Sequence, residues 1–288
     1  MLRHHIERHH MVAIKPVYKY FAAAVGALLI LLVVIAYLTR REEIRLREIH
    51  VHVDSLENII PISDTLVPPY VYDHVIMLGT LPLEQRKKKF VDVMLPAILI
   101  VRYRLLESEE KVKSIIEKIK EGEEVHPEDS LYISSLMQQY HVKDTADLIP
   151  ALHPHPVSIA LAQAALESGW GSSRFFKEAN NVFGIWSYDP EEPRVRAAYR
   201  RAEKAVYLKK YDNLMSSVKD YFKIIGRGRV YRQFRKKRME TTNVFELIWY
   251  LRSYSEKRSQ YVVLLRDVIV ANDFLKYDHY QLHPDYFE

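Results

Sequence analysis

The sequence predicts a mainly α-helical protein with a small β-hairpin lobe, preceded by a single apolar helix near the amino terminus. Three observations favour this fold class. Glycine is scarce, at 8 of 288 residues, and long side chains are common, which favours helices over a turn-rich β-sandwich. Apolar residues recur at helical spacing over most of the chain after residue 80. Residues 180–211 lack that spacing and alternate instead, as strands do.

A run of eighteen uncharged residues, 21–38, marks the amino-terminal apolar helix. Its length is near the minimum that spans a bilayer, and Tyr20 and Tyr37 lie near its ends, where aromatic rings favour the membrane interface. No small-residue cleavage motif follows, which favours an anchor over a cleaved signal peptide. We therefore expect a cytoplasmic tail at 1–17 and a single transmembrane anchor at 18–38.

The next part of the chain predicts a stalk and then a helical segment. Residues 39–80 alternate weakly and contain three prolines, which favours a stalk or linker. Residues 81–150 have helical spacing, with Pro96 expected to kink or divide the first helix. Two shorter helices are expected at 108–122 and 127–140.

Residues 151–288 form the expected main domain. Its predicted helices cover 156–166, 212–225, 242–252 and 258–270. The chain has no cysteine, which excludes disulfides, thiolate metal sites and thiol nucleophiles. We expect no cofactor and no metal site, and the sequence leaves the oligomeric state open.

Glu167 is the candidate catalytic residue. It closes an otherwise apolar helix, and a Gly-Trp-Gly turn follows it at 169–171. Apolar surroundings and the negative end of the helix dipole both disfavour the ionised carboxylate. A carboxylic acid that stays protonated near neutral pH is what a glycosidase needs to protonate a leaving oxygen. The alternative is a solvated glutamate at a helix end.

Four ordered motifs resemble those of the peptidoglycan glucosaminidases, glycoside hydrolase family 73. They are AQAALESGWGSS around Glu167, NNVFGI from Asn180, YDNLMSSVKDYF from Tyr211, and YSEKRSQY from Tyr254 to Tyr261. The upstream sequence LEQRKKKFVDVMLPAIL resembles the segment before the core of Bax-like proteins of Gram-negative bacteria. The resemblance covers residues 80–275. It implies a lysozyme-like helical fold with a cleft between a helical lobe and a small β-lobe.

The resemblance also implies roles for individual residues. Glu167 matches the catalytic acid of the family, and Tyr254 matches an aromatic residue near that acid. The candidate substrate-binding residues are Trp170, Asn180, Asn181, Phe183 and Tyr261. The alternative for the asparagines is that they order a turn, and for Phe183 that it packs beneath the cleft. Trp170 either stacks on a sugar ring or wedges the Gly-Trp-Gly turn into the core.

Hydrolysis with two carboxylates needs a second acid, and the β-lobe region supplies the candidates Asp189, Glu191, Glu192 and Glu203. No motif selects among them. The N-acetyl group of the substrate, or a single isolated acid, would serve as the alternative mechanism.

The resemblance implies a hydrolase that cleaves the β-1,4 bond after N-acetylglucosamine in peptidoglycan glycan strands. The alternatives are a lytic transglycosylase of the same fold and a non-catalytic peptidoglycan-binding or scaffold protein. The expected location is the inner membrane, with the catalytic domain in the periplasm. The basic run 226–238 carries seven positive charges in thirteen positions. Outside the membrane nucleic acid is absent, so this run faces anionic wall peptides or lipids, or simply solvent.

Overall fold

The computed structural model describes residues 20–21, 24–28, 30, 45–201 and 204–288. The chain splits into two compact units, residues 1–45 and 46–288. The predicted tail at 1–17 and most of the predicted anchor at 18–38 lie outside the described residues. Within the described part of the chain, no helix combines the length and the apolar character needed to cross a membrane.

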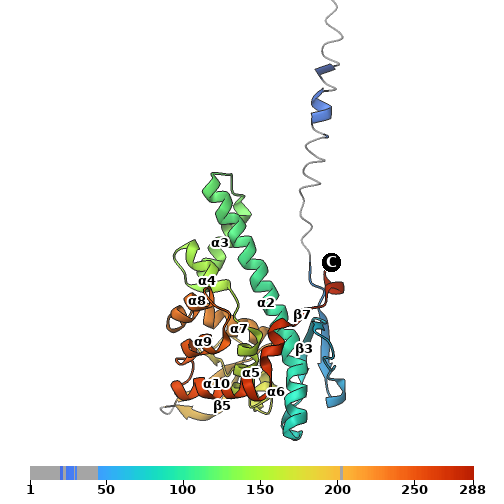
Figure 1. Cartoon of the computed structure of the whole chain (residues 1–288), viewed down its shortest axis with the longest axis vertical. Coiled ribbons are helices and arrows are strands. Elements are labelled where there is room, and N and C mark those ends of the chain that lie inside the picture. Colours follow the sequence, from blue (N-terminus) through green and yellow to red (C-terminus); the bar gives the residue numbers. More distant parts are fainter. Residues whose placement is uncertain (1–19, 22–23, 29, 31–44, 202–203) are drawn as a thin grey trace, which may run out of the picture. The chain divides into compact units, whose positions relative to one another are not determined.

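Helix α2, Leu83–Glu121, is the longest element of the second unit, at 39 residues. It runs without a break through Pro96, so the expected division there, and the separate helix expected at 108–122, are wrong (Figure 1). Every residue from Phe90 to Val101 is buried. Burial on all sides holds the helix together and outweighs the cost of about 3 kcal/mol for an internal proline. The helix ends at Gly122, whose φ of 73° suits the left-handed cap.

The helices expected at 127–140, 156–166, 212–225 and 258–270 are present, with bounds that differ by at most two residues. The helix expected at 242–252 is a short α-helix followed by a 3₁₀ turn. The helices Leu148–Leu152, Arg174–Ala179 and Arg232–Arg238 were not expected. Asn213 caps α7 by accepting from the Ser216 amide, and Asn243 caps α9 by accepting from the Phe245 and Glu246 amides. The α-helices are α3 Pro127–Tyr140, α4 Leu148–Leu152, α5 Val157–Ser168, α6 Arg174–Ala179, α7 Leu214–Arg227, α8 Arg232–Arg238, α9 Val244–Ile248 and α10 Ser259–Ala271. Short 3₁₀ turns are η1 Leu56–Asn58, η2 Leu78–Thr80, η3 Thr145–Asp147, η4 Arg229–Tyr231, η5 Trp249–Leu251, η6 Phe274–His279 and η7 Pro284–Tyr286.

The predicted β-lobe is a three-stranded antiparallel sheet. Its strands are β4 Trp186–Ser187, β5 Arg194–Arg201 and β6 Lys204–Lys209, in the order β4-β6-β5. The expectation of a mainly helical domain with a small β-lobe is therefore confirmed.

Residues 46–80 differ from the expected stalk, because they fold onto the helices. Strand β1, Ile49–Val53, pairs in parallel with β3, Tyr70–Val75, and β2, Leu66–Val67, pairs with β7, Gln281–Leu282. In Figure 1, β3 and β7 both lie beside α2, although β7 comes from the opposite end of the sequence. The segment supplies fully buried side chains to the main core: Val53, Ile59, Val67, Val71, Tyr72, Val75 and Leu78.

The structure changes the expected domain boundaries and the interpretation of residues 49–53. Residues 46–288 form a single compact unit, so the expected segments 81–150 and 151–288 are not separate bodies. The alternation in IHVHV, which looked too weak for a strand, is a β-strand whose isoleucine and valines turn inward and whose histidines face solvent.

Candidate active site

The candidate acid lies at the end of the most deeply buried helix, α5. Ten of its twelve residues are buried, whereas Glu167 is exposed to solvent. The helix is apolar nearly all round, which places it in the core. Glu167 is its penultimate residue, so the core holds the backbone of the acid while its side chain reaches the surface.

The turn after Glu167 is tightly constrained. Gly169, Trp170 and Gly171 all adopt positive φ, of 57°, 59° and 72°. A side chain at Gly171 would place its Cβ 2.9 Å from Leu78 Cδ1, so glycine is required there both for φ and for space. The Leu78 amide donates to the Gly171 carbonyl over 3.1 Å. The amino-terminal segment thus supports the turn that follows the candidate acid.

Trp170 packs into the core side of this turn. Its ring lies edge-on to Phe90 at 5.6 Å between centroids and tilted against Phe274 at 5.8 Å, with Lys87 Nζ 5.6 Å above its face. These contacts match the wedge alternative. A ring held by three neighbours orders the turn, and nothing in these contacts aims it at a sugar.

Three tyrosines surround the candidate acid, and one bonds to it directly. The Tyr261 hydroxyl donates to Glu167 Oε1 over 2.9 Å. The Tyr254 ring stacks on the Tyr261 ring at 5.6 Å with an interplanar angle of 12°, and Tyr231 lies 6.3 Å from Tyr254. The structure therefore brings Glu167, Tyr254 and Tyr261 together, from α5, from the loop after η5, and from α10.

Protein surroundings raise the pKa of Glu167 above its ordinary value, which is the direction expected from the sequence. Desolvation is the main cause, while the Tyr261 hydrogen bond and the positive charge of Lys257 partly oppose it. Glu167 is exposed to solvent, and Tyr231, Tyr254 and Tyr261 lie close enough to its carboxyl group to feel its charge. This combination gives a carboxyl group that solvent or substrate can reach and that favours its protonated form more than a free glutamate does.

Sequence reasoning missed the polar residues behind the acid. Gln163, one helical turn before Glu167, is fully buried; its Nε2 donates to the Tyr261 hydroxyl over 3.0 Å, and its Oε1 accepts from Tyr221 over 2.6 Å. A glutamine inside an otherwise apolar helix was the available signal, because a buried amide needs partners.

The motif after the catalytic helix orders the chain. Asn180, with φ of 48°, donates through Nδ2 to the Asp73 and Tyr211 carbonyls over 2.9 and 3.0 Å. Asn181 donates through Nδ2 to the Ile185 and Lys209 carbonyls, both over 2.9 Å, and accepts from the Ile185 amide. These contacts match the turn-ordering alternative for both asparagines.

Phe183 also has a packing role. It is buried, and its ring stacks on Tyr221 at 4.0 Å between centroids with an interplanar angle of 8°. It therefore lies beneath the tyrosine that supports Gln163, and not at a sugar-contacting surface.

The candidate second carboxylates have partners of their own. Asp189 Oδ1 accepts from the Glu191 amide over 2.9 Å, which closes a turn. Glu192 Oε2 lies 3.3 Å from Lys209 Nζ. The Glu191 side chain is exposed, and Glu203 lies outside the described residues.

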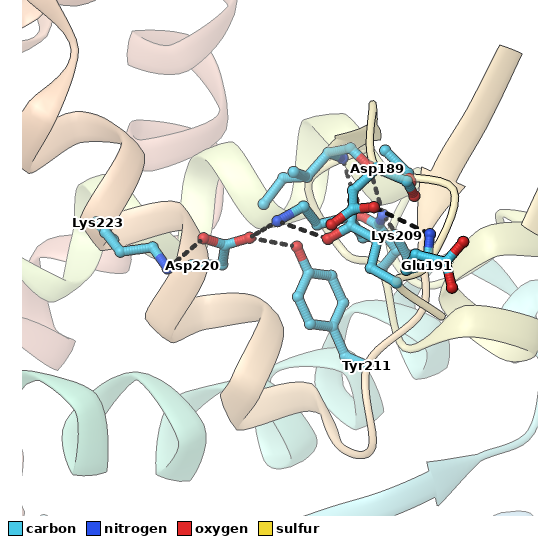
Figure 2. A network of polar contacts seen from close by, with 10 residues as sticks. Asp189, Glu191, Lys209, Tyr211, Asp220 and Lys223 are labelled. Atoms are coloured by element: carbon cyan, nitrogen blue, oxygen red, sulfur yellow. Dashed lines mark hydrogen bonds and ion pairs between the residues drawn. The ribbon is translucent and has the colours of Figure 1, made fainter. Parts of the chain in front are cut away.

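Figure 2 shows how Lys209 joins the β-lobe to α7. Its Nζ lies 3.1 Å from Asp220 Oδ2, which also accepts from the Tyr211 hydroxyl over 2.8 Å, while Lys223 Nζ lies 3.2 Å from Oδ1. Burial opposes ionisation of Asp220, but Lys223, Tyr211 and Lys209 outweigh it and lower its pKa. This network has a structural explanation, and none of its contacts involves Glu167.

The basic run 226–238 is partly used inside the protein. Arg235 donates to the Ile225 and Gly228 carbonyls, Arg238 donates to the Pro150 and Ala151 carbonyls, and Lys237 pairs with Glu246 and Glu240. Three of the seven charges thus cap backbone or pair internally, which weakens the expectation of an anion-binding surface. Within the described residues, no three His, Asp or Glu side chains gather as a metal ion would require.

Part of the sequence is similar to known glucosaminidases. Residues 144–274 match the family model "Glucosaminidase: Mannosyl-glycoprotein endo-beta-N-acetylglucosaminidase". The chain is 33% identical to the exo-glucosaminidase LytG of Bacillus subtilis (strain 168) over 119 residues, which are 39% of this chain. The chain spans 39% of the length of that relative.

Parts of solved structures also match this chain, with low TM-scores. The catalytic domain of the autolysin Auto from Listeria monocytogenes has a TM-score of 0.37 at 22% identity, covering 54% of this chain and 89% of that domain. A peptidoglycan hydrolase from Sphingomonas sp. A1 has a TM-score of 0.36 at 21% identity, covering 50% of this chain and 85% of that one.

Proposed function

We propose, on the premise that residues 144–274 belong to the glucosaminidase family of glycoside hydrolases, that the chain hydrolyses the glycan strands of peptidoglycan. The bond cleaved would be the β-1,4 linkage after N-acetylglucosamine. One observation carries the proposal: an accessible carboxyl group, Glu167, has a raised pKa and a hydrogen bond from Tyr261 that fixes one of its oxygens.

Glu167 serves as the general acid in this proposal. Its proton passes to the glycosidic oxygen as the bond to the anomeric carbon breaks, so the leaving sugar departs as a neutral alcohol. Water then adds to the anomeric carbon and loses its proton to a base. Glu167, which is a carboxylate once it has given up its proton, is that base. Asp189 and Glu192 are engaged locally, which favours the N-acetyl oxygen of the substrate over either of them as the group that stabilises the positive charge at the anomeric carbon.

Tyr254 helps to position the sugar or the positive charge that develops on it. Its ring lies parallel to Tyr261 and is half-buried, so its orientation is fixed before substrate arrives. A fixed aromatic ring beside a developing oxocarbenium charge stabilises that charge without a reorganisation cost.

The test is mass spectrometry of the soluble products after the purified full-length chain digests peptidoglycan. Glu167→Gln removes the acid proton and keeps the shape, and Glu178→Gln is a matched control because Glu178 is exposed and paired with Arg174. We expect fragments with N-acetylglucosamine at the reducing end from wild type and Glu178→Gln, and none from Glu167→Gln.

Other outcomes would identify the alternatives. Products with a 1,6-anhydro ring would assign the chain to the lytic transglycosylases. Retention of glycan without any product, in wild type as in Glu167→Gln, would favour a binding or scaffold protein. Release of single sugars would indicate attack at chain ends, and release of longer fragments would indicate internal cleavage.

We also propose that residues 18–38 anchor the chain in the inner membrane with residues 46–288 in the periplasm, since the substrate lies there. The support is the uncharged run at 21–38. Of two reporter enzymes fused after Glu288, the one that works only in the periplasm should be active and the one that works only in the cytoplasm should be inactive. Activity of the cytoplasmic reporter would contradict the proposal.

Within the family, we propose that the chain belongs with the Bax-like proteins. The support is the sequence of residues 83–99, which form the first part of α2, a helix that packs against α5. A Bax-like structure in which that segment leaves the catalytic helix uncovered would contradict this placement.

A further inference from the structure

A line of hydrogen bonds, which we call the His155–Glu167 chain, runs through the core to the candidate acid. His155 Nε2 lies 2.8 Å from the Tyr221 hydroxyl, which donates to Gln163 Oε1 over 2.6 Å. Gln163 Nε2 donates to the Tyr261 hydroxyl over 3.0 Å, and Tyr261 donates to Glu167 Oε1 over 2.9 Å. The members come from the loop before α5 and from α5, α7 and α10.

All members of the His155–Glu167 chain except Glu167 are buried from solvent. His155 and Gln163 are fully buried, and Tyr221 and Tyr261 are 1% and 3% exposed. Water therefore does not compete for these groups, and each must find its donor or acceptor within the chain.

Counting protons gives the chain a single direction. A phenol has one proton to donate, an amide oxygen only accepts, and an amide nitrogen only donates. Tyr261 accepts from Gln163 Nε2, so its own proton goes to Glu167. Tyr221 gives its proton to Gln163 Oε1, so it accepts from a protonated His155 Nε2.

The state of His155 agrees with this direction. Burial lowers its pKa well below the ordinary value, so the ring is neutral. Its Nδ1 is buried without a hydrogen-bond partner among the described residues, which suits an unprotonated nitrogen in the Nε2–H tautomer. The ring is held in place by stacking on Phe222 at 4.5 Å.

We propose that Gln163 is a positioning residue whose amide orientation makes the chain donate toward Glu167, so that Oε1 is held as an acceptor and the acid proton resides on Oε2. This rests on the proposed role of Glu167 as the general acid. The opposite amide orientation would make Tyr261 donate to Gln163 and accept from Glu167. The acid proton would then point into the core, away from any substrate.

The groups around Glu167 determine how its titration responds to a broken chain. The titratable and charged groups that face it are Tyr221 on α7, Tyr231 on η4, Tyr254 and Lys257 in the loop before α10, and Tyr261 on α10. Lys257 and the Tyr261 hydroxyl lower its pKa. If Tyr261 is no longer obliged to donate to the carboxylate, one of these two influences weakens and the pKa rises.

The experiment interrupts the chain behind Tyr261. Tyr221→Phe removes one hydroxyl and leaves the ring stacked on Phe183. Gln163→Met keeps the length of the side chain and removes both the amide oxygen and the amide nitrogen. We expect kcat on peptidoglycan to fall about 10-fold or more with KM unchanged, and the basic limb of the pH profile of kcat/KM to move to higher pH. Tyr140→Phe removes a hydroxyl from an equally buried tyrosine outside the chain, and should match wild type.

Two NMR measurements give readouts besides activity. The ¹³C carboxyl signal of Glu167, assigned by its loss in Glu167→Gln, should titrate at higher pH in both interrupted variants than in wild type. In the wild type, ¹⁵N shifts should show His155 protonated at Nε2. The Nδ1–H tautomer would overturn the proposal even if neither variant folds.

The outcomes separate this inference from the proposed function. One outcome would overturn only the positioning role: Tyr221→Phe and Gln163→Met keep the kcat, the pH profile and the Glu167 titration of wild type, while Glu167→Gln is inactive. Full activity of Glu167→Gln would overturn both.

Discussion

Tyr261 donates a hydrogen bond of 2.9 Å to Glu167, and this one contact acts against the dominant influence on the carboxyl group. Desolvation raises the pKa of Glu167, and the Tyr261 hydroxyl lowers it because it stabilises the ionised form. Two influences on the pKa of Glu167 therefore oppose each other: desolvation favours the protonated form, and the Tyr261 hydroxyl favours the ionised form and keeps one oxygen in place. Because the direction of each influence is known, the direction in which a substitution should move the pKa can be predicted.

Tyr261→Phe should move the basic limb of kcat/KM to higher pH. The substitution removes an influence that lowers the pKa of Glu167, while desolvation, which raises it, remains. We also expect a loss of stability of about 1–3 kcal/mol, because Gln163 Nε2 loses its acceptor in a buried site. The pH profile and urea unfolding measure the two effects. A limb that stays in place, or moves to lower pH, would show that the hydroxyl does not govern the titration.

Glu167→Gln should be more stable than wild type at neutral pH. The folded-state pKa of Glu167 is raised, so its contribution to stability is fully present below the unfolded pKa and is lost as pH rises through the folded pKa. A glutamine never ionises and escapes that loss. The difference in Tm should therefore shrink toward zero as the pH falls below about 4. A wild type as stable as Glu167→Gln at neutral pH would mean that the site does not disfavour the carboxylate.

Much of the helical framework could be predicted because it is encoded locally. The apolar spacing of α3 and α10, and the asparagine cap of α9, are visible within single segments. The position of Glu167 at the end of a buried helix needed only the pattern of α5. Its crowding by tyrosines from distant segments followed from motif order, and not from any local signal.

The features that could not be predicted depend on contacts between distant segments. Pro96 stays inside α2 because buried side chains surround it, a gain that no local pattern reports. Residues 66–67 form a strand only because residues 281–282 pair with them. Gln163 could be noticed as a buried amide, but its partners Tyr221 and Tyr261 lie 58 and 98 residues away. Propensity rules see none of these relationships.

Leu78→Ala should destabilise the protein by about 2–5 kcal/mol, the range for large-to-small changes in a core. Leu78 is fully buried and lies against Gly171 in the turn after Glu167. Leu66→Ala is the matched control, because Leu66 is 38% exposed and should change stability by less than about 0.5 kcal/mol. Chemical denaturation compares the two. Equal and negligible effects would restore the view of residues 46–80 as a passive stalk.

Tyr211→Phe should cost about 1.5–3 kcal/mol at neutral pH, the range for a hydrogen bond to a charged group. Its hydroxyl donates to Asp220 over 2.8 Å, within the network that joins the β-lobe to α7. The folded-state pKa of Asp220 is lowered, so its contribution to stability is present above the unfolded pKa and is lost as pH falls through the folded pKa. The cost of Tyr211→Phe should accordingly diminish in acid, as Asp220 becomes protonated in both proteins. Urea unfolding at neutral and acidic pH measures this, with Tyr188→Phe, at an 83% exposed position, as the neutral control. A cost that is the same at both pH values would show that the effect comes from the loss of the hydroxyl itself and does not depend on the charge on Asp220.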